Sequence, residues 1–150
     1  MCIRDRYWSA PTDGAVRYRS ADEYAEHFRF LLQGAVADRL RTECVGILLS
    51  GGLDSAALAA IAREISGNSS DAADLRAYTN IYEPLISDRD GALAQEVADF
   101  LKIPIQFLEI DAFKLFERWN DPELASPEPV DDPLFAGLFD QYEMIARRCV

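Results

Sequence analysis

The chain has 150 residues, of which 49% are hydrophobic, and a formal net charge of −11. This length and apolar content predict one globular domain with a real core and exclude an intrinsically disordered chain. The acidic charge repels phosphate backbones and anionic lipids, so we expect neither nucleic acid nor a membrane as a partner. The three cysteines, Cys2, Cys44 and Cys149, are far apart and predict neither a disulfide framework nor a metal cluster. Without a signal-peptide or membrane-spanning pattern, we expect a soluble, cytoplasmic protein.

The two ends of the sequence suggest that it is a piece of a longer protein. Residues 1–6 match one reading frame of a transposon end used in sequencing libraries, so we interpret them as a technical scar and expect no catalytic role for Cys2. Residues 7–19 lack periodicity and are typical of a connector. The helical pattern before Val150 runs out without a stop signal, which predicts that residues 20–150 are the N-terminal part of a larger domain.

The predicted elements alternate between helix and strand. Ser20 and Glu23 have the spacing of a capping box, and apolar residues at helical spacing then predict a helix to about residue 41 that packs on a sheet. The unbroken apolar run at 44–49 predicts a strand that is covered on both faces. This order predicts an α/β fold, a Rossmann-like parallel sheet with flanking helices. The following elements are a helix at 55–65, a strand at 75–82, a helix at 88–102 and a strand at 105–110.

The pattern is weaker in the last third of the chain. Residues 113–119 predict a short helix, 121–133 an acidic, proline-rich loop, and 134–148 a further helix. Glu128, or a neighbour such as Asp132, is a second candidate for facing a substrate, and a solvated loop is the alternative.

Other polar residues have ordinary structural explanations. We expect His27 on the surface of the first helix, Cys44 to pack as a small hydrophobic residue, and Asp88 and Asp90 to cap a helix.

The segment that follows the first strand carries the strongest functional signal. The sequence Ser-Gly-Gly-Leu-Asp-Ser lies between a predicted buried strand and a helix N-terminus, at the edge where parallel sheets bind ligands. Gly51 and Gly52 let the backbone turn sharply and approach a ligand, and the first helical amides carry partial positive charge. Ser50 and Ser55 add hydroxyl donors, and Asp54 can cap the helix or hold Mg²⁺.

Other phosphate-binding motifs do not fit this segment. A Walker loop needs a lysine before Ser or Thr, and the chain's lysines are Lys102 and Lys114. A dinucleotide fingerprint needs a third glycine at the GxGxxG spacing, which residues 50–56 lack. The remaining alternative is a tight turn that Asp54 or Ser55 caps, but the strand before it and the amphipathic helix after it favour a nucleotide site.

The sequence from Leu48 to Ser55, Leu-Leu-Ser-Gly-Gly-Leu-Asp-Ser, resembles the pyrophosphate loop of glutamine-hydrolysing asparagine synthases and of related enzymes in the adenine nucleotide alpha-hydrolase superfamily. The order and spacing of the elements over residues 20–150 are similar to the synthetase domain of that family. In such enzymes ATP adenylates a carboxylate, pyrophosphate leaves, and ammonia from a glutaminase domain displaces AMP.

The resemblance implies a role for each matching residue. ATP and Mg²⁺ are the implied ligands, Asp54 would hold the metal ion, and main-chain groups at Leu48 and near Asn80 would face adenine. It assigns no catalytic side chain. The pyrophosphate loop would comprise Ser50, Gly51, Gly52, Leu53, Asp54 and Ser55.

The family's second glycine-rich acidic motif would follow beyond Val150, and a glutaminase domain would lie upstream. We therefore expect the 150 residues alone to be inactive and to bind ATP weakly at most. The full-length protein would make asparagine from aspartate with ammonia or glutamine. Two alternatives remain open: a synthetase of the same family that closes β-lactam or macrolactam rings, and a catalytically silent nucleotide-binding module.

Overall fold

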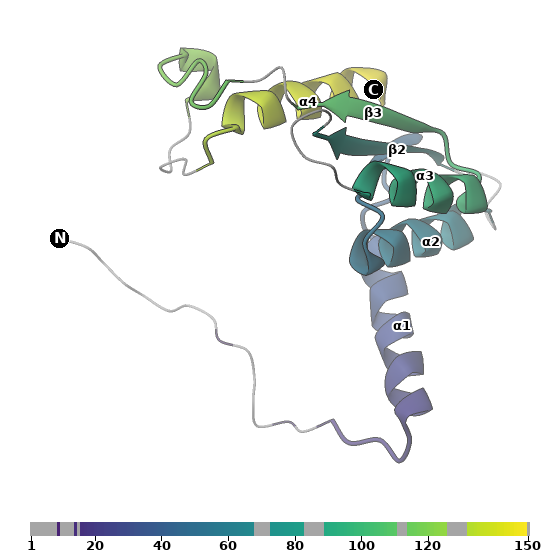
Figure 1. Cartoon of the computed structure of the whole chain (residues 1–150). Helices are drawn as coiled ribbons and strands as arrows, with labels where there is room; N and C mark the ends of the chain where they lie inside the picture. The colour runs from purple at the N-terminus through teal and green to yellow at the C-terminus, as the bar shows by residue number, and fades with distance from the viewer. Residues whose placement is uncertain are drawn as a thin grey trace.

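The computed structural model describes residues 9, 14, 16–67, 73–82, 89–110, 114–125 and 132–149. Helices and strands alternate along most of the chain, as the apolar periodicity predicts (Figure 1). No helix among the described residues has both the length and the apolar character to cross a bilayer. The elements are α1 (Ala21–Ala37), β1 (Cys44–Leu48), α2 (Leu53–Gly67), β2 (Asp74–Ile81), α3 (Asp90–Leu101), β3 (Ile105–Glu109), a 3-10 turn (Pro122–Leu124) and α4 (Phe135–Arg148).

The three strands form one parallel sheet in the order β1-β2-β3. Tyr78 of β2 lies opposite Leu48, the last residue of β1, and opposite Gln106 of β3. Because the strands are parallel, their carboxyl ends lie at the same edge of the sheet, where β2 and β3 run on past the end of β1. Since the helices α2 and α3 connect these parallel strands, the predicted Rossmann-like α/β architecture is confirmed.

Alternate residues of the strands point to opposite faces of the sheet. On one face, Leu75 and Ala77 of β2 and Leu49 after β1 join α2 and α3 in the hydrophobic core, where Ala94 and Ala98 of α3 are fully buried. The small alanines let α3 approach the sheet closely. The loop that follows Leu49 is thus anchored at the core.

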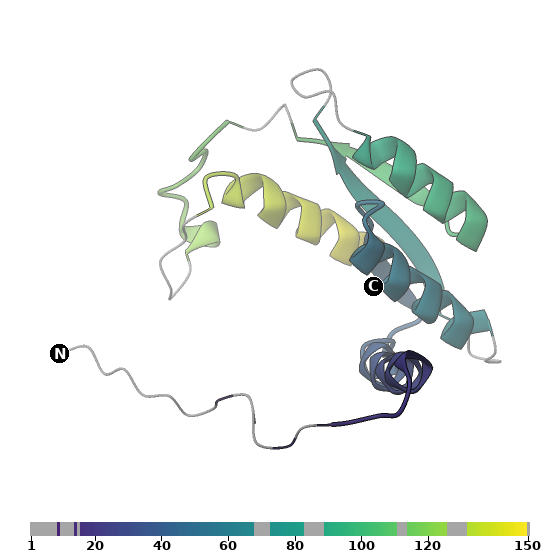
Figure 2. The same cartoon turned by 60° about the horizontal axis from the view of Figure 1, so that its bottom comes forward.

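The opposite face of the sheet is covered in part by α4, which returns across the strands (Figure 2). Gly46 of β1 makes room for this helix, because a Cβ built there would lie 2.5 Å from the Cγ2 atom of Ile145. Gln141 of α4 is bonded to Asn80 of β2 farther along the same face. The helix therefore reaches the strand ends that carry the predicted site.

The helix α1 differs from its predicted role. Ser20 caps it by accepting from the Glu23 amide, but Glu23 reaches back to the amide of Arg19. The helix ends at Ala37 and packs on α2 instead of on the sheet, and an ion pair of 2.8 Å between Arg29 and Glu64 joins the two helices. Tyr24, Phe28 and Leu31 of the predicted apolar stripe stay exposed, whereas Val36 and Leu40 near the end of the helix pack against the core.

Two further predictions about secondary structure are wrong. β1 is covered well on one face only, because Val45 and Ile47 pack against the core whereas Gly46 and Leu48 on the other face are exposed, Leu48 to 46%. The described part of the predicted helix at 113–119 forms turns, since Phe116 and Arg118 have φ angles of 57° and 53°, which an α-helix does not accommodate. Arg118 donates to Asp140 of α4 at 2.6 Å, and this bond raises the pKa of the guanidinium above its ordinary value.

The cysteine prediction is also wrong. Cys44 at the start of β1 forms a disulfide with Cys149, the C-cap residue of α4, with a Cα–Cα distance of 4.7 Å. The two residues are 105 positions apart in sequence, and only the return of α4 across the sheet brings them together. Disulfides are typical of oxidising compartments. The cysteine pattern therefore no longer supports a cytoplasmic location, which remains a prediction.

Candidate nucleotide site

The glycine-containing loop occupies the carboxyl end of β1 and leads directly into α2. Two hydroxyl groups close it: the Ser50 amide donates to Ser55 Oγ at 3.2 Å, and the two serine Oγ atoms lie 3.1 Å apart. Ser55 Oγ in turn donates to the Gly52 carbonyl at 3.2 Å, and the Ala56 amide donates to the same carbonyl at 3.0 Å. The serines therefore shape the loop itself, and each hydroxyl remains near its open side.

The surroundings of the two glycines of the loop differ. Gly51 has a φ of 74°, and a Cβ at this position would lie 2.5 Å from Leu93 Cβ and 2.6 Å from the Ala94 amide nitrogen of α3. A side chain would also be strained in this left-handed conformation. At Gly52 a Cβ would meet only Ser50 Oγ, at 3.4 Å. Gly51 thus packs the loop against α3, whereas the surroundings of Gly52 are open except for the Ser50 hydroxyl.

The first turn of α2 provides donors for an anion. The opening amides of an α-helix have no partner within the helix and carry part of its dipole. Leu53 begins the helix with 86% of its surface exposed, and Asp54 follows it. Asp54 makes no hydrogen bond or ion pair with any described residue, so its carboxylate does not cap the helix. It is available for a cation, although the described residues contain no group of three metal-ligating side chains.

A hollow of about 310 Å³ lies beside the loop at the carboxyl ends of β1 and β2. It brings together three of the predicted residues, Leu48, Ser50 and Asn80. The other five predicted residues, from Gly51 to Ser55, lie in the loop and the first turn of α2 and do not line it. The remaining lining residues are Leu49, Tyr78, Thr79, Tyr82 and Asp90.

The sequence does not identify three residues that line this hollow, which are Thr79, Tyr82 and Asp90. Alternation along the predicted strand could have placed Tyr82 on the same face as Asn80. Asp90 lies in the first turn of α3, and the cap position belongs to Arg89, whose side chain makes no capping bond. The expectation that Asp90 caps this helix is therefore wrong, because Asp90 lies one residue after the cap position. Asp88 lies outside the described residues.

The acidic loop contributes little to the described site. Glu128 lies outside the described residues, so its predicted role is untested. Asp132 accepts a hydrogen bond from the Leu134 amide at 2.8 Å, just before α4 begins, which is a structural role. His27 accepts from or donates to the Tyr18 hydroxyl through Nδ1 and stacks on Phe30, far from the loop in sequence and on α1.

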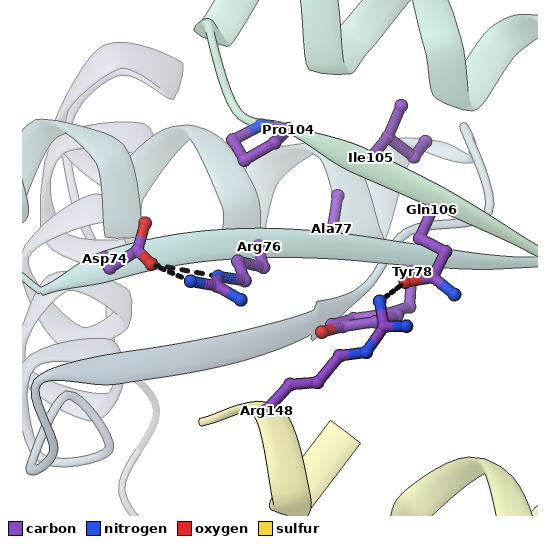
Figure 3. A pocket seen from close by; sticks show the side chains of 8 residues that line it. All are labelled: Asp74, Arg76, Ala77, Tyr78, Pro104, Ile105, Gln106 and Arg148. Carbon is purple, nitrogen blue, oxygen red and sulfur yellow. Dashed lines mark hydrogen bonds and ion pairs between the residues drawn. The ribbon is translucent and has the colours of Figure 1, made fainter. Parts of the chain in front are cut away.

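A second hollow of about 370 Å³ lies toward the opposite ends of β2 and β3 (Figure 3). Its two arginines already have partners: Arg76 pairs with Asp74 at 2.7 Å, and Arg148 donates to Gln106. This hollow lacks the combination of glycine loop and helix N-terminus, so the first hollow is the better nucleotide site.

A family model for asparagine synthase matches residues 27–150. The chain belongs to the asparagine synthase family. This is a family of ATP-dependent, amide-forming ligases, and the match includes the glycine loop and every element that surrounds the first hollow. Family membership thus agrees with the sheet topology and with the resemblance of the loop.

Two curated fungal relatives are similar over most of the chain. Amidase chry2 of Gibberella zeae is 30% identical over an alignment of 137 residues, and the alignment covers 84% of this chain and 20% of the relative. Amidase chyE of Penicillium rubens is 28% identical over an alignment of 123 residues, and this alignment covers 76% of this chain and 18% of the relative. The chain spans about a fifth of the length of the curated relatives it matches.

Proposed function

We propose that this chain forms part of the ATP-binding site of an amide-forming ligase similar to asparagine synthase. The observation that carries the proposal is the glycine loop at the N-terminus of α2, next to a hollow whose size suits a nucleotide base. In this arrangement the base and ribose occupy the hollow and the phosphates lie on the loop. The substrate is a small-molecule carboxylate, with aspartate as the first choice.

The proposed reaction has two steps, which are adenylation of the carboxylate and displacement of AMP by ammonia. A carboxylate oxygen of the substrate attacks the α-phosphorus of ATP, the bond to the bridging oxygen breaks, and pyrophosphate leaves with the electron pair. Ammonia, supplied free or from glutamine by a glutaminase domain elsewhere in the protein, then attacks the activated carbonyl carbon and loses a proton to solvent, and the carbon–oxygen bond to AMP breaks so that AMP leaves with the electron pair. The amides of the first turn of α2 donate to the departing pyrophosphate, and the hydroxyls of Ser50 and Ser55 would rotate away from their bonds within the loop to add two further donors. Fixed donors that face developing charge lower the barrier directly.

Asp54 is the residue of this site that suits a magnesium ion. It is exposed beside the loop, it has no described partner, and carboxylate and phosphate oxygens together are the usual ligands of Mg²⁺. A bound Mg²⁺ would neutralise charge on the phosphates. Asp54 itself would orient the ion at the helix N-terminus. Main-chain groups at Leu48 and near Asn80 would contact the base from the two strand ends.

Both relatives are named amidases, which favours a second candidate, in which the full-length protein acts on an amide. Amide hydrolysis needs an activated nucleophile. The chain's single histidine is His27, which is bonded to Tyr18, so the described residues offer no serine–histidine pair at the loop. An amidase site would therefore lie in another part of the protein. Ring closure in a peptide natural product would use the same adenylation site with a different carboxylate.

The test is Mg-ATP binding by isothermal titration calorimetry with the full-length protein that carries this chain, followed by exchange of labelled pyrophosphate into ATP. We expect binding, and exchange that depends on a carboxylate substrate. Asp54→Ala should abolish the magnesium dependence, and Asp74→Ala, at the far end of β2, serves as the matched carboxylate control. Absence of ATP binding by the wild-type protein would refute the proposal.

A further inference from the structure

The side chain of Asn80 is held by a residue from a distant part of the chain. Gln141 of α4 donates a hydrogen bond from Nε2 to the Oδ1 atom of Asn80, at 2.6 Å. Asn80 lines the hollow beside the loop, whereas Gln141 lies behind it and is only 5% exposed. This bond links α4 directly to the carboxyl end of β2. It determines which part of the Asn80 amide remains for a ligand.

Gln141 is an unusual residue for its position. Its Oε1 atom is buried and has no hydrogen-bond partner among the described residues. A buried polar atom without a partner destabilises a fold by about 1–3 kcal/mol. Its buried neighbours along α4, Ala136 and Gly137, are small and without polar side chains. A methionine would fill nearly the same volume without this loss, so packing alone does not account for the glutamine.

The bond to Gln141 orients the side-chain amide of Asn80. Gln141 occupies one acceptor position of Oδ1, whereas both N–H groups of Nδ2 are without a partner among the described residues and are the donors that Asn80 can offer to the hollow. The ring nitrogens of a purine are acceptors of such a donor. We propose that Gln141 is a positioning residue of the nucleotide site, which orients Asn80 so that its Nδ2 group donates to the adenine ring of ATP. This inference rests on the proposed function.

The experiment compares Gln141→Met, Gln141→Leu, Asn80→Ala and the double variant Asn80→Ala/Gln141→Met in the full-length protein. Calorimetry measures the Kd of Mg-ATP and of inorganic pyrophosphate, and thermal denaturation without ligand measures Tm. Each glutamine variant should weaken ATP binding about three- to tenfold, the range of one net hydrogen bond. Pyrophosphate affinity should not change, since pyrophosphate occupies the loop alone. The exposed Glu143→Gln on α4 is the control and should change neither affinity.

The pattern of results separates positioning from a structural role. Removal of the buried Oε1 should leave Tm equal or higher while ATP binding weakens, which a merely structural glutamine would not produce. In the Asn80→Ala background, Gln141→Met should have no further effect on ATP binding. Equal ATP affinity of wild type and both glutamine variants, or effects that add to that of Asn80→Ala, would overturn the inference and leave the proposed function standing. Failure of the wild type to bind Mg-ATP would overturn both.

Discussion

Gly51→Ala and Gly52→Ala form a matched pair that tests how the loop is built. The two glycines are adjacent and receive the same methyl group, but the structure assigns them different surroundings. At Gly51 the new Cβ would lie within 2.8 Å of three atoms of Leu93 and Ala94, two of which belong to the backbone of α3. At Gly52 the nearest atom would be Ser50 Oγ, at 3.4 Å. We therefore expect the first change to affect folding and the second to affect ligand binding.

The magnitude at Gly51 follows from two contributions. An alanine held at a φ of 74° is strained by roughly 1–2 kcal/mol. Overpacking against a backbone that cannot rotate away adds about 1–3 kcal/mol. The sum of about 2–5 kcal/mol is a large part of the stability of a typical domain. Gly52→Ala introduces neither a left-handed alanine nor a contact shorter than 3.4 Å, and it should change the free energy of unfolding by less than about 1 kcal/mol.

Urea denaturation followed by circular dichroism measures the free energy of unfolding, and calorimetry measures Mg-ATP affinity for the variant that stays folded. Gly52→Ala should weaken ATP binding about tenfold or more, because its methyl group stands where a phosphate would accept charge-assisted hydrogen bonds. If Gly51→Ala unfolds at the same urea concentration as the wild type, the proposed packing of the loop on α3 is wrong. If Gly52→Ala binds ATP normally, the phosphates do not lie on this loop.

Three further predictions concern the helices around the site. Gly46→Ala should loosen α4 and destabilise the protein by about 1–3 kcal/mol in urea denaturation, and an unchanged midpoint would contradict the close approach of this helix. Thiol labelling of the denatured protein without reductant should modify one of the three cysteines, and three labelled thiols would refute the pairing. Cys44→Ala should lower the free energy of unfolding by up to about 4 kcal/mol, because the bridge to Cys149 closes a long loop. Arg29→Ala should lower stability by at most about 1 kcal/mol, and less in high salt, because its bond to Glu64 is exposed; a larger, salt-independent loss would mean that Arg29 packs α1 on α2.

Local patterns in the sequence predict most of the secondary structure. The strands at 44–49, 75–82 and 105–110 each lie within one residue of the observed strand ends. Each strand of a buried parallel sheet consists of a short apolar run, so each strand can be recognised from its own residues. The turns at 115–120 were missed, because the apolar spacing there is typical of a helix and the left-handed conformations of Phe116 and Arg118 leave no such trace in the sequence.

The candidate site was predictable in part. The loop from Ser50 to Ser55 is a contiguous string between a strand and a helix, so its place at the edge of the sheet follows from chain order. The family resemblance implies Asn80, and the parallel pairing of β1 with β2 brings the carboxyl end of its strand to the same edge of the sheet. The prediction treated Gly51 and Gly52 alike. The packing of α3 against Gly51 distinguishes them, and this contact joins residues that are far apart in the chain.

The sequence by itself determined the alternation of elements, the parallel sheet and the position of the glycine loop, because each depends on residues that are close along the chain. Only the tertiary structure decided where α4 lies. Its return across the sheet pairs Cys44 with Cys149 and places Gln141 behind Asn80. These contacts join positions separated by 105 and 61 residues, and no local spacing encodes a contact at such distances.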